Sequence, residues 1–199
     1  MCLNHSTEHC VAPLQAPSLD DGRVPQCFKN ERASPASMSD NTQPVPSKDA
    51  ARKERTFVMI KPDGMRRGLA GQVLSRYEAK GLKLVAARLM RISPELAKRH
   101  YEEHKEKPFF PELVRFITSS PVLVMALEGR NAVQVVRAIN GATKPWEALP
   151  GTVRGDLALA LTPNVVHASD SVPTAQRELA LYFQESDYHP YDRSDEEYL

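Results

Sequence analysis

The stretch "TFVMIKPDG", residues 56–64, decides how this chain divides and where its fold begins. Its run of β-branched and aromatic residues predicts a strand, and Pro62-Asp63-Gly64 predicts the turn that ends the strand. Residues 1–54 differ, because they are rich in Pro, Ser, Asn and Asp and carry no sustained apolar periodicity. Such a segment buries too little apolar surface to offset about 1–2 kcal/mol of backbone entropy per ordered residue. We therefore predict a disordered Pro/Ser-rich extension over 1–54 and one folded domain over 55–199.

Beyond this first strand, the apolar pattern alternates between helices and strands. "LAGQVLSRYEAKG" (69–81) predicts a helix that ends at a glycine, and "LKLVAARLM" (82–90) predicts a second strand. A helical pair follows: one helix opens at Ser93-Pro94 and ends before Pro108. The other has its apolar face at Phe110, Leu113, Val114 and Ile117. The last predicted elements are a strand "PVLVMAL" (121–127), a helix (130–140), a strand "NVVHA" (164–168) and a helix (172–183).

This order of elements predicts an α+β fold. It matches a ferredoxin-like, four-stranded antiparallel sheet (βαββαβ) with an inserted helical pair and an additional C-terminal helix. We expect the helices to cover one face of the sheet.

Composition narrows the class of partner. Lys and Arg number 26 against 25 Asp and Glu, so nucleic acid and anionic membranes are not expected as main partners. No apolar stretch approaches the roughly 18 residues of a membrane-spanning helix. All three cysteines fall within the first 27 residues, which argues against a disulfide framework in the folded domain. We expect a cytoplasmic protein.

The segment "NVVHASDS" (164–171) contains the first candidate catalytic group. If Val165 and Val166 belong to a strand, His167 lies at its edge, where a nucleophile or general base would be partly exposed and rigidly held. Glu178 follows eleven residues later, in the predicted C-terminal helix. A carboxylate that accepts from one ring nitrogen fixes the tautomer and makes the other nitrogen more nucleophilic. The alternatives are a structural histidine and a solvated helix glutamate.

Cationic side chains mark two further segments. In "KPDGMRRG" (61–68), Lys61 leaves a strand end beside a turn, where it could meet phosphate or a ribose hydroxyl, although the Walker spacing is absent. The long stretch 141–156 carries Thr143 and Arg154, and Arg137 precedes it by one helical turn. These three side chains could converge on a polyphosphate, or they could lie on a solvated basic surface.

Two other motifs have competing interpretations. "HYEEH" (100–104) matches the H-x-x-E-H zinc-protease pattern, which makes a protease the rival enzyme class. A solvated charged helix face explains these residues better, because nothing downstream marks a third zinc ligand. In "KPFF", Phe109 and Phe110 could both belong to the core; if only Phe110 continues the inward stripe, Phe109 points elsewhere and could stack on a planar ligand such as a base.

Taken together, "TFVMIKPDG", "RRGLAGQV", "KPFF", "PGTVRGD" and "NVVHASDS" followed by Glu178 resemble the nucleoside diphosphate kinase family. The resemblance runs from about Arg55 to Phe183. It implies a ping-pong reaction in which His167 takes the γ-phosphate of ATP or another nucleoside triphosphate. The phosphohistidine then passes this group to a nucleoside diphosphate, with broad tolerance of base and sugar.

The resemblance also implies a role for each site residue. Nδ1 of His167 is phosphorylated while Glu178 holds the other nitrogen and Ser169 supports the glutamate. Lys61 and Tyr101 lie beside the transferred group. The implied nucleotide-binding residues are Lys61 and Asn164 for ribose, Arg137, Thr143 and Arg154 for phosphates, Phe109 for the base, and Leu161 beside it. Mg²⁺ is the implied cofactor, held mainly by the nucleotide phosphates rather than by protein ligands.

The sequence leaves alternatives open for the oligomeric state and for the function. Members of this family form homo-oligomers, so a hexamer or a tetramer is expected; the C-terminal tail and the loop around Lys144 contribute to the subunit contacts. Leu127 and Ala168 stand where many members have tryptophan and glycine, and neither change removes a site residue. The competing function is a catalytically silent nucleotide- or nucleic-acid-binding module of the same fold.

Overall fold

The computed structural model describes residues 53–195, so most of the predicted extension over 1–54 lies outside the described residues. The strands are β1 (Lys53–Ile60), β2 (Lys83–Met90), β3 (Val122–Arg130) and β4 (Val166–Ala168). The helices are α1 (Pro62–Arg66), α2 (Ala70–Ala79), α3 (Pro94–His100), α4 (Phe110–Thr118), α5 (Ala132–Asn140), α6 (Val153–Leu157) and α7 (Val172–Tyr182). Short 3-10 turns occupy η1 (Glu102–His104), η2 (Pro145–Glu147) and η3 (Glu185–Asp187).

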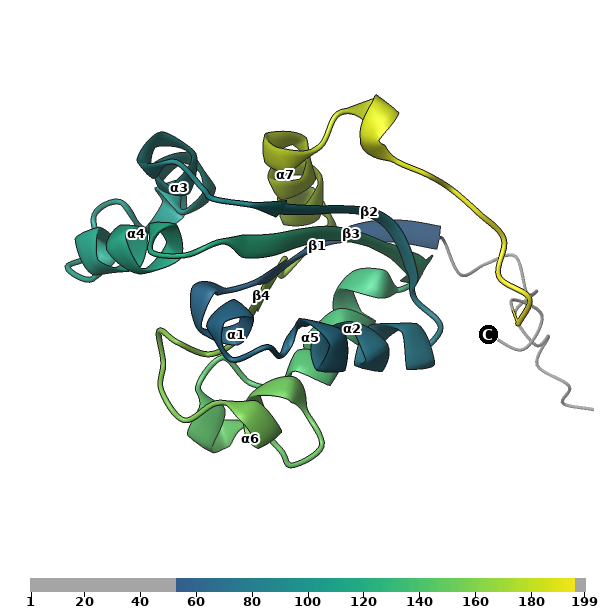
Figure 1. The fold of residues 1–199 in the computed structure, drawn as a ribbon, viewed down its shortest axis with the longest axis horizontal. Coiled ribbons are helices and arrows are strands. Elements are labelled where there is room, and N and C mark those ends of the chain that lie inside the picture. The colour runs from purple at the N-terminus through teal and green to yellow at the C-terminus, as the bar shows by residue number, and fades with distance from the viewer. Residues whose placement is uncertain (1–52, 196–199) are drawn as a thin grey trace, which may run out of the picture. The chain divides into compact units, whose positions relative to one another are not determined.

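The strands form one antiparallel sheet in the order β2-β3-β1-β4 (Figure 1). The central pair β1–β3 is in register from Lys53 opposite Arg130 to Ile60 opposite Leu123. Strand β4 is short and pairs only with the end of β1, where His167 lies opposite Met59. This is the predicted ferredoxin-like arrangement, with α3 and α4 as the inserted helical pair and α7 as the additional helix.

Both faces of the sheet are covered, which corrects the expectation that helices cover one face. Helices α3 and α7 lie on one side of the sheet, and α2 and α5 lie on the other (Figure 1). Side chains of β1 alternate between two apolar clusters, with Phe57 and Met59 facing the first side and Val58 and Ile60 the second. The consecutive apolar residues 57–60 of β1 need a cover on each face, because their side chains alternate and each buried apolar side chain stabilises the fold by about 1.5–3 kcal/mol.

Several element boundaries differ from the prediction. The Pro62-Asp63-Gly64 turn is the start of α1, in which proline occupies the first turn, where a backbone N–H is not needed. The helix that opens at Ser93 ends at His100 and gives way to η1. Helix α2 ends at Ala79 with Lys80 as its C-cap, and the predicted terminal glycine, Gly81, follows with φ +95°. There, Gly81 N–H donates to the Glu78 carbonyl and Leu82 N–H donates to the Tyr77 carbonyl, the pattern of a Schellman cap.

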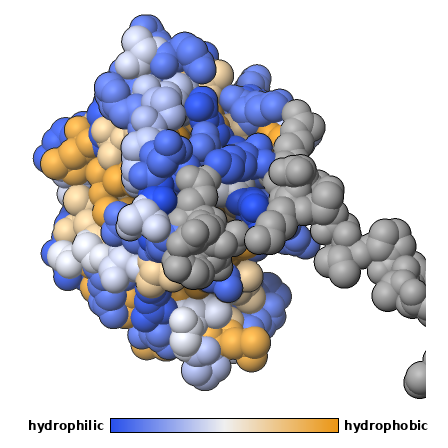
Figure 2. All heavy atoms as spheres, turned by 90° about the vertical axis from the view of Figure 1, so that its right-hand side faces the viewer, coloured by the Kyte–Doolittle hydropathy of each residue, from blue (hydrophilic) through white to orange (hydrophobic). Residues whose placement is uncertain are grey.

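The side of the molecule at the right of Figure 1 is mainly hydrophilic, with hydrophobic groups gathered along one flank and at the bottom (Figure 2). Among the described residues, no helix is both long and apolar enough to cross a membrane.

Candidate functional site

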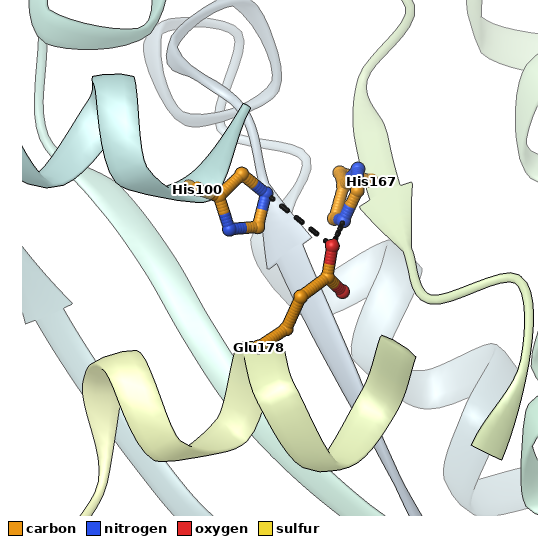
Figure 3. A group of neighbouring side chains, drawn as sticks. All are labelled: His100, His167 and Glu178. Carbon is orange, nitrogen blue, oxygen red and sulfur yellow. Dashed lines mark hydrogen bonds and ion pairs between the residues drawn. The ribbon is translucent and has the colours of Figure 1, made fainter. Parts of the chain in front are cut away.

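The register of β4 sets the direction in which His167 points. Residues that lie directly opposite one another in antiparallel strands project to the same face, so the imidazole shares the face of Met59. Helices α3 and α7 cover that face and bring His100 and Glu178 beside it (Figure 3). The centroids of the His100 and His167 rings are 4.6 Å apart and meet edge to face. Helix α3, which is distant in sequence, therefore meets the consecutive elements β4 and α7 at one imidazole.

The carboxylate of Glu178 contacts the imidazole of His167, a pairing that the sequence predicted. His167 Nε2 lies 3.0 Å from Glu178 Oε1, and Ser169 Oγ donates to Glu178 Oε2 at 2.6 Å. A carboxylate only accepts hydrogen bonds, so Nε2 carries the proton and Nδ1 keeps its lone pair. Glu178 is buried in the inward stripe of α7, which rules out a solvated helix residue.

The backbone before His167 is held in a strained turn. Val165 has φ +71°, and Val166 N–H donates to the Asn164 carbonyl at 2.8 Å, which closes a three-residue γ-turn. A β-branched residue in the left-handed region costs about 1–3 kcal/mol. Neighbouring groups fix this turn: Lys61 N–H donates to the Val165 carbonyl, and Asp63 Oδ2 accepts from Val165 N–H. The "KPDG" turn thus positions the strand that carries the histidine.

The sequence pattern assigns His100 only to the zinc-protease motif, yet in the structure its ring lies next to that of His167. Its side chain is completely buried, and neither ring nitrogen has a hydrogen-bond partner within the described part of the chain. Burial, followed by the neighbouring His167, lowers its pKa well below the usual value, so the ring is neutral. The signal that could have identified it is its place on the inward face of α3 with Ala97.

Lys61 is one of four Lys and Arg side chains that line the same cavity, together with Arg137, Arg154 and Arg177. Its Nζ donates to Asn164 Oδ1 at 2.6 Å, and Asn164 Nδ2 donates to the Thr143 carbonyl at 3.0 Å. Burial and the nearby charge of Arg154 lower the pKa of Lys61 to about 7, although Asp63 opposes the shift. Burial and a neighbouring cation both disfavour the charged form of this amine, and an anionic ligand would stabilise that form.

Arg154 is the second buried cation. Its guanidinium donates to the Gly141 carbonyl at 2.8 Å and to the Val166 carbonyl at 2.9 Å, so it ties the long loop to β4. Burial lowers the pKa of Arg154 to about 10, and the charge of Arg137 acts in the same direction. The guanidinium remains charged at neutral pH. Together with Lys61, these arginines create a positive region at the floor of a cleft.

A cavity of about 430 Å³ joins these groups. Its lining includes all the predicted site residues: Lys61, Tyr101, Phe109, Arg137, Thr143, Arg154, Leu161, Asn164, His167, Ser169 and Glu178. Phe109 and Leu161 are each 51% exposed at the cleft, so an aromatic face is available to a planar ligand. The sequence reasoning missed other lining residues, among them His100, His104, Leu113, Thr162, Asp170 and Arg177.

The H-x-x-E-H pattern does not form its expected metal pair. Helix α3 ends at His100, so His104 belongs to η1 instead of lying one α-helical turn further along the same face. The His104 ring instead stacks parallel to Tyr101. The geometry that the zinc-protease interpretation required is therefore missing.

Known proteins match this arrangement. The family model of nucleoside diphosphate kinase matches residues 54–188. A nucleoside diphosphate kinase of Thermus thermophilus is 62% identical over 131 residues, which is 66% of this chain and 96% of that protein. A halophilic nucleoside diphosphate kinase from Halobacterium salinarum, solved in complex with CDP, is 48% identical with a TM-score of 0.72 and covers 74% of this chain and 98% of its own.

A second solved structure is a transition-state mimic of the nucleoside diphosphate kinase from Borrelia burgdorferi with bound vanadate and ADP. It is 38% identical with a TM-score of 0.70, and the match covers 72% of this chain and 95% of that one. The segment that the family model matches includes every residue lining the cleft. The chain therefore belongs to the nucleoside diphosphate kinase family.

Proposed function

We propose that this nucleoside diphosphate kinase transfers the γ-phosphate of a nucleoside triphosphate to a nucleoside diphosphate through a phosphohistidine at His167. The observation that carries the proposal is the pair of contacts from Glu178, one to His167 Nε2 and one to Ser169 Oγ. With Nε2 engaged, Nδ1 is the nitrogen that meets the substrate.

The reaction has two half-steps with the same geometry. The Nδ1 lone pair attacks the γ-phosphorus, the N–P bond forms, and the bond from phosphorus to the β-phosphate oxygen breaks. The nucleoside diphosphate leaves, a different diphosphate takes its place, and its terminal oxygen attacks the phosphohistidine. Attack turns the ring into a cation, and the buried carboxylate of Glu178 stabilises that charge.

Positive groups hold the phosphates. Lys61, Arg137 and Arg154 face the cavity, and phosphoryl transfer depends mainly on positioning and on charge neutralisation. Lys61 and Asn164 share a hydrogen bond, and we assign the ribose hydroxyls to this pair; Thr143 and Tyr101 line the same cavity, and we assign them to the phosphate path. An incoming phosphate would offset the mutual repulsion of the three cations.

Mg²⁺ is the cofactor that we assign to the nucleotide rather than to the protein. Mg²⁺ prefers octahedral oxygen ligands and keeps several waters. The two carboxylate oxygens of Glu178 accept from His167 and Ser169, and Lys61, Arg137 and Arg154 line the cleft, which supports Mg²⁺ that arrives on the phosphates. When bound, the ion would neutralise phosphate charge.

Base recognition in this proposal depends on stacking. Phe109 offers an exposed ring, and Leu161 lies on the same cavity wall. A stacked face distinguishes poorly among bases, because it reads no hydrogen-bonding edge. We expect exchange with purine and pyrimidine, ribo- and deoxyribonucleotides alike.

The assignment is tested by brief exposure of the full chain to [γ-³²P]ATP. We expect an acid-labile, alkali-stable label on the protein that is discharged by added dTDP, and no label on His167→Ala. Persistent labelling of His167→Ala would contradict the role of this residue. Exchange between ATP and dTDP without any labelled protein would contradict the two-step reaction.

A homo-oligomer, either a hexamer or a tetramer, completes the proposal. Large apolar side chains are exposed around the long loop, with Trp146 at 63%, Leu149 at 74% and Leu159 at 92%. Strand β2 also forms one edge of the sheet. Light scattering coupled to size exclusion should give six or four subunits, and a monomer would contradict this part. The cytoplasmic location stays a prediction of the sequence.

A further inference from the structure

Three side chains with metal-binding atoms meet inside the cleft. One ligand atom from each of His100, His167 and Glu178 lies within 4.8 Å of the other two (Figure 3). Both histidines aim Nε2 at the same oxygen, Glu178 Oε1, at 3.8 Å for His100 and 3.0 Å for His167. Ligands of a tetrahedral zinc ion, each about 2.0–2.2 Å from the metal, lie roughly 3.3 Å apart, so small side-chain shifts would seat an ion among these atoms.

His100 supplies an independent observation. Its side chain is 0% exposed, yet both of its nitrogens lack a hydrogen-bond partner in the described residues. An unpaired buried polar group costs about 1–3 kcal/mol, so a ring that meets no donor or acceptor calls for an explanation. The nucleotide reaction proposed above gives His100 no role. The ring nevertheless points one nitrogen at the catalytic carboxylate (Figure 3).

The ligand set selects a class of metal. Two imidazoles and one carboxylate form a known zinc set that keeps a fourth position open. Imidazole nitrogen suits Zn²⁺, Co²⁺ and Cu²⁺, whereas Mg²⁺ prefers oxygen. The His167 side chain is 21% exposed, so the cavity offers a route for the ion and space for a water ligand. We propose that His100, His167 and Glu178 form a site for a divalent transition-metal ion such as Zn²⁺, and that the bound ion inhibits phosphoryl transfer.

The inhibition follows from the atoms involved. The metal replaces the proton on His167 Nε2, and that proton leaves to solvent. The metal also takes the Glu178 oxygen that otherwise accepts from Nε2. A cation on Nε2 withdraws electron density from the ring, so Nδ1 attacks phosphorus more slowly. This inhibition rests on the proposed function, whereas metal binding to the nucleotide-free protein does not.

Binding is tested with Co²⁺, whose visible absorption reports tetrahedral nitrogen and oxygen ligands. The full chain is titrated with CoCl₂ without nucleotide, and Zn²⁺ is then added to displace the signal. We expect a tetrahedral spectrum in the unaltered chain and in the matched control His104→Phe, which removes the neighbouring histidine outside the cluster. We expect its loss in His100→Phe and in Glu178→Gln.

Residues 1–52 include cysteines and histidines that could bind Co²⁺, but they are the same in all variants. The difference spectrum between the unaltered chain and His100→Phe therefore isolates the cluster. Equal spectra in these two proteins would overturn the site. His100→Asn, a smaller polar replacement, serves as a second variant should the phenylalanine disturb folding. Imidazole ¹⁵N NMR of the unaltered chain needs no variant. Zn²⁺ should shift the ¹⁵N resonances of the His100 and His167 rings, and unshifted resonances would overturn the proposal.

Inhibition is measured as the Zn²⁺ concentration that halves ATP–dTDP exchange in excess Mg²⁺, relative to the metal-free rate of each protein. Loss of one of three ligands should raise this concentration at least about tenfold in His100→Phe, and His104→Phe should match the unaltered chain. Equal sensitivity of His100→Phe would overturn the inhibitory role. Failure of exchange without metal would contradict the proposed function instead, and the Co²⁺ spectrum would still decide binding.

Discussion

The two faces of the sheet are packed with different chemistry. Toward α2 and α5, the side chains of Val58, Ile60 and Leu127 are fully buried among apolar neighbours. The main polar contact there is the hydrogen bond that the Tyr77 hydroxyl donates to Asn140 Oδ1 at 2.6 Å. Toward α3 and α7, four titratable side chains are buried in and beside the apolar layer: His100, Tyr101, Glu178 and Tyr182.

Both faces contain buried groups without a hydrogen-bond partner among the described residues: Thr56 Oγ1 and Asn140 Nδ2 lie toward α2 and α5, and a second set lies toward α3 and α7. The hydroxyls of Tyr101 and Tyr182 and both nitrogens of His100 have no hydrogen-bond partner among the described residues. Burial raises the pKa of both tyrosines, so their hydroxyls stay neutral donors. Each unpaired group costs about 1–3 kcal/mol. The difference between the faces is that the unpaired His100 and Tyr101 lie beside the ring of His167, whereas no group toward α2 and α5 contacts that ring through an aromatic pair in the described residues.

The largest effect should come from Glu178→Gln on the functional face. The amide keeps the shape but loses the charge that stabilises the imidazolium, so kcat should fall by about 100-fold or more. The unfolding free energy should change little, because a buried charge is removed without leaving a void. Steady-state exchange and urea unfolding measure the two quantities. A stable variant with unaltered kcat would contradict the claim that catalysis depends on the face toward α3 and α7.

Leu127→Ala should show the reverse behaviour on the opposite face. This side chain is fully buried, so its truncation should lower the unfolding free energy by about 2–5 kcal/mol. The rate per folded molecule should remain close to that of the unaltered chain, because Leu127 does not line the cleft. Chemical denaturation and active-site-normalised kinetics provide the check. A large loss of kcat at full folding would contradict the comparison.

A smaller difference should separate two neighbouring valines. Val165 and Val166 are both fully buried, but only Val165 has positive φ. Each change to glycine loses a buried side chain, whereas only Val165→Gly also relieves backbone strain. Val165→Gly should therefore destabilise the fold less than Val166→Gly, by about 1–3 kcal/mol in denaturant unfolding. Equal losses would mean that the turn stores no strain.

The smallest effect concerns the proton on Lys61. With a pKa of about 7, most Lys61 amines are uncharged at pH 8 in the free protein. A bound phosphate favours the charged form and raises the pKa, so ATP binding should take up close to one proton at pH 8. Affinity should then fall by up to about tenfold per pH unit above pH 7.

Calorimetry in buffers of different ionisation enthalpy measures this uptake. Lys61→Arg is the matched control, because arginine stays charged and should take up no proton. Equal uptake in the two proteins would assign the proton to another group.

Much of the fold followed from the residues. The alternation of apolar strands and periodic helices predicted the antiparallel sheet and the inserted helical pair. The covering of both faces was missed, although the continuous apolar run of β1 carried that information. The end of α3 at His100 was also missed, because the charged sequence that follows is compatible with further helix.

The candidate site was also predicted only in part. The pairing of His167 with Glu178 was predicted, since a strand, a turn and a helix can return a side chain eleven residues later. The strained turn at Val165 was not, because a valine gives no sequence signal for positive φ. The position of His100 was missed because it depends on α3 crossing the same sheet face as α7, which is a tertiary arrangement.

The central claim is that Glu178 reserves Nε2 of His167 and leaves Nδ1 to carry the phosphoryl group. The direct measurement is the isomer of phosphohistidine formed after brief exposure of the chain to ATP and alkaline quenching, followed by digestion and NMR of the peptide that contains residue 167. The account predicts Nδ1-phosphohistidine at this residue. Phosphate on Nε2, or on any other side chain, would contradict it.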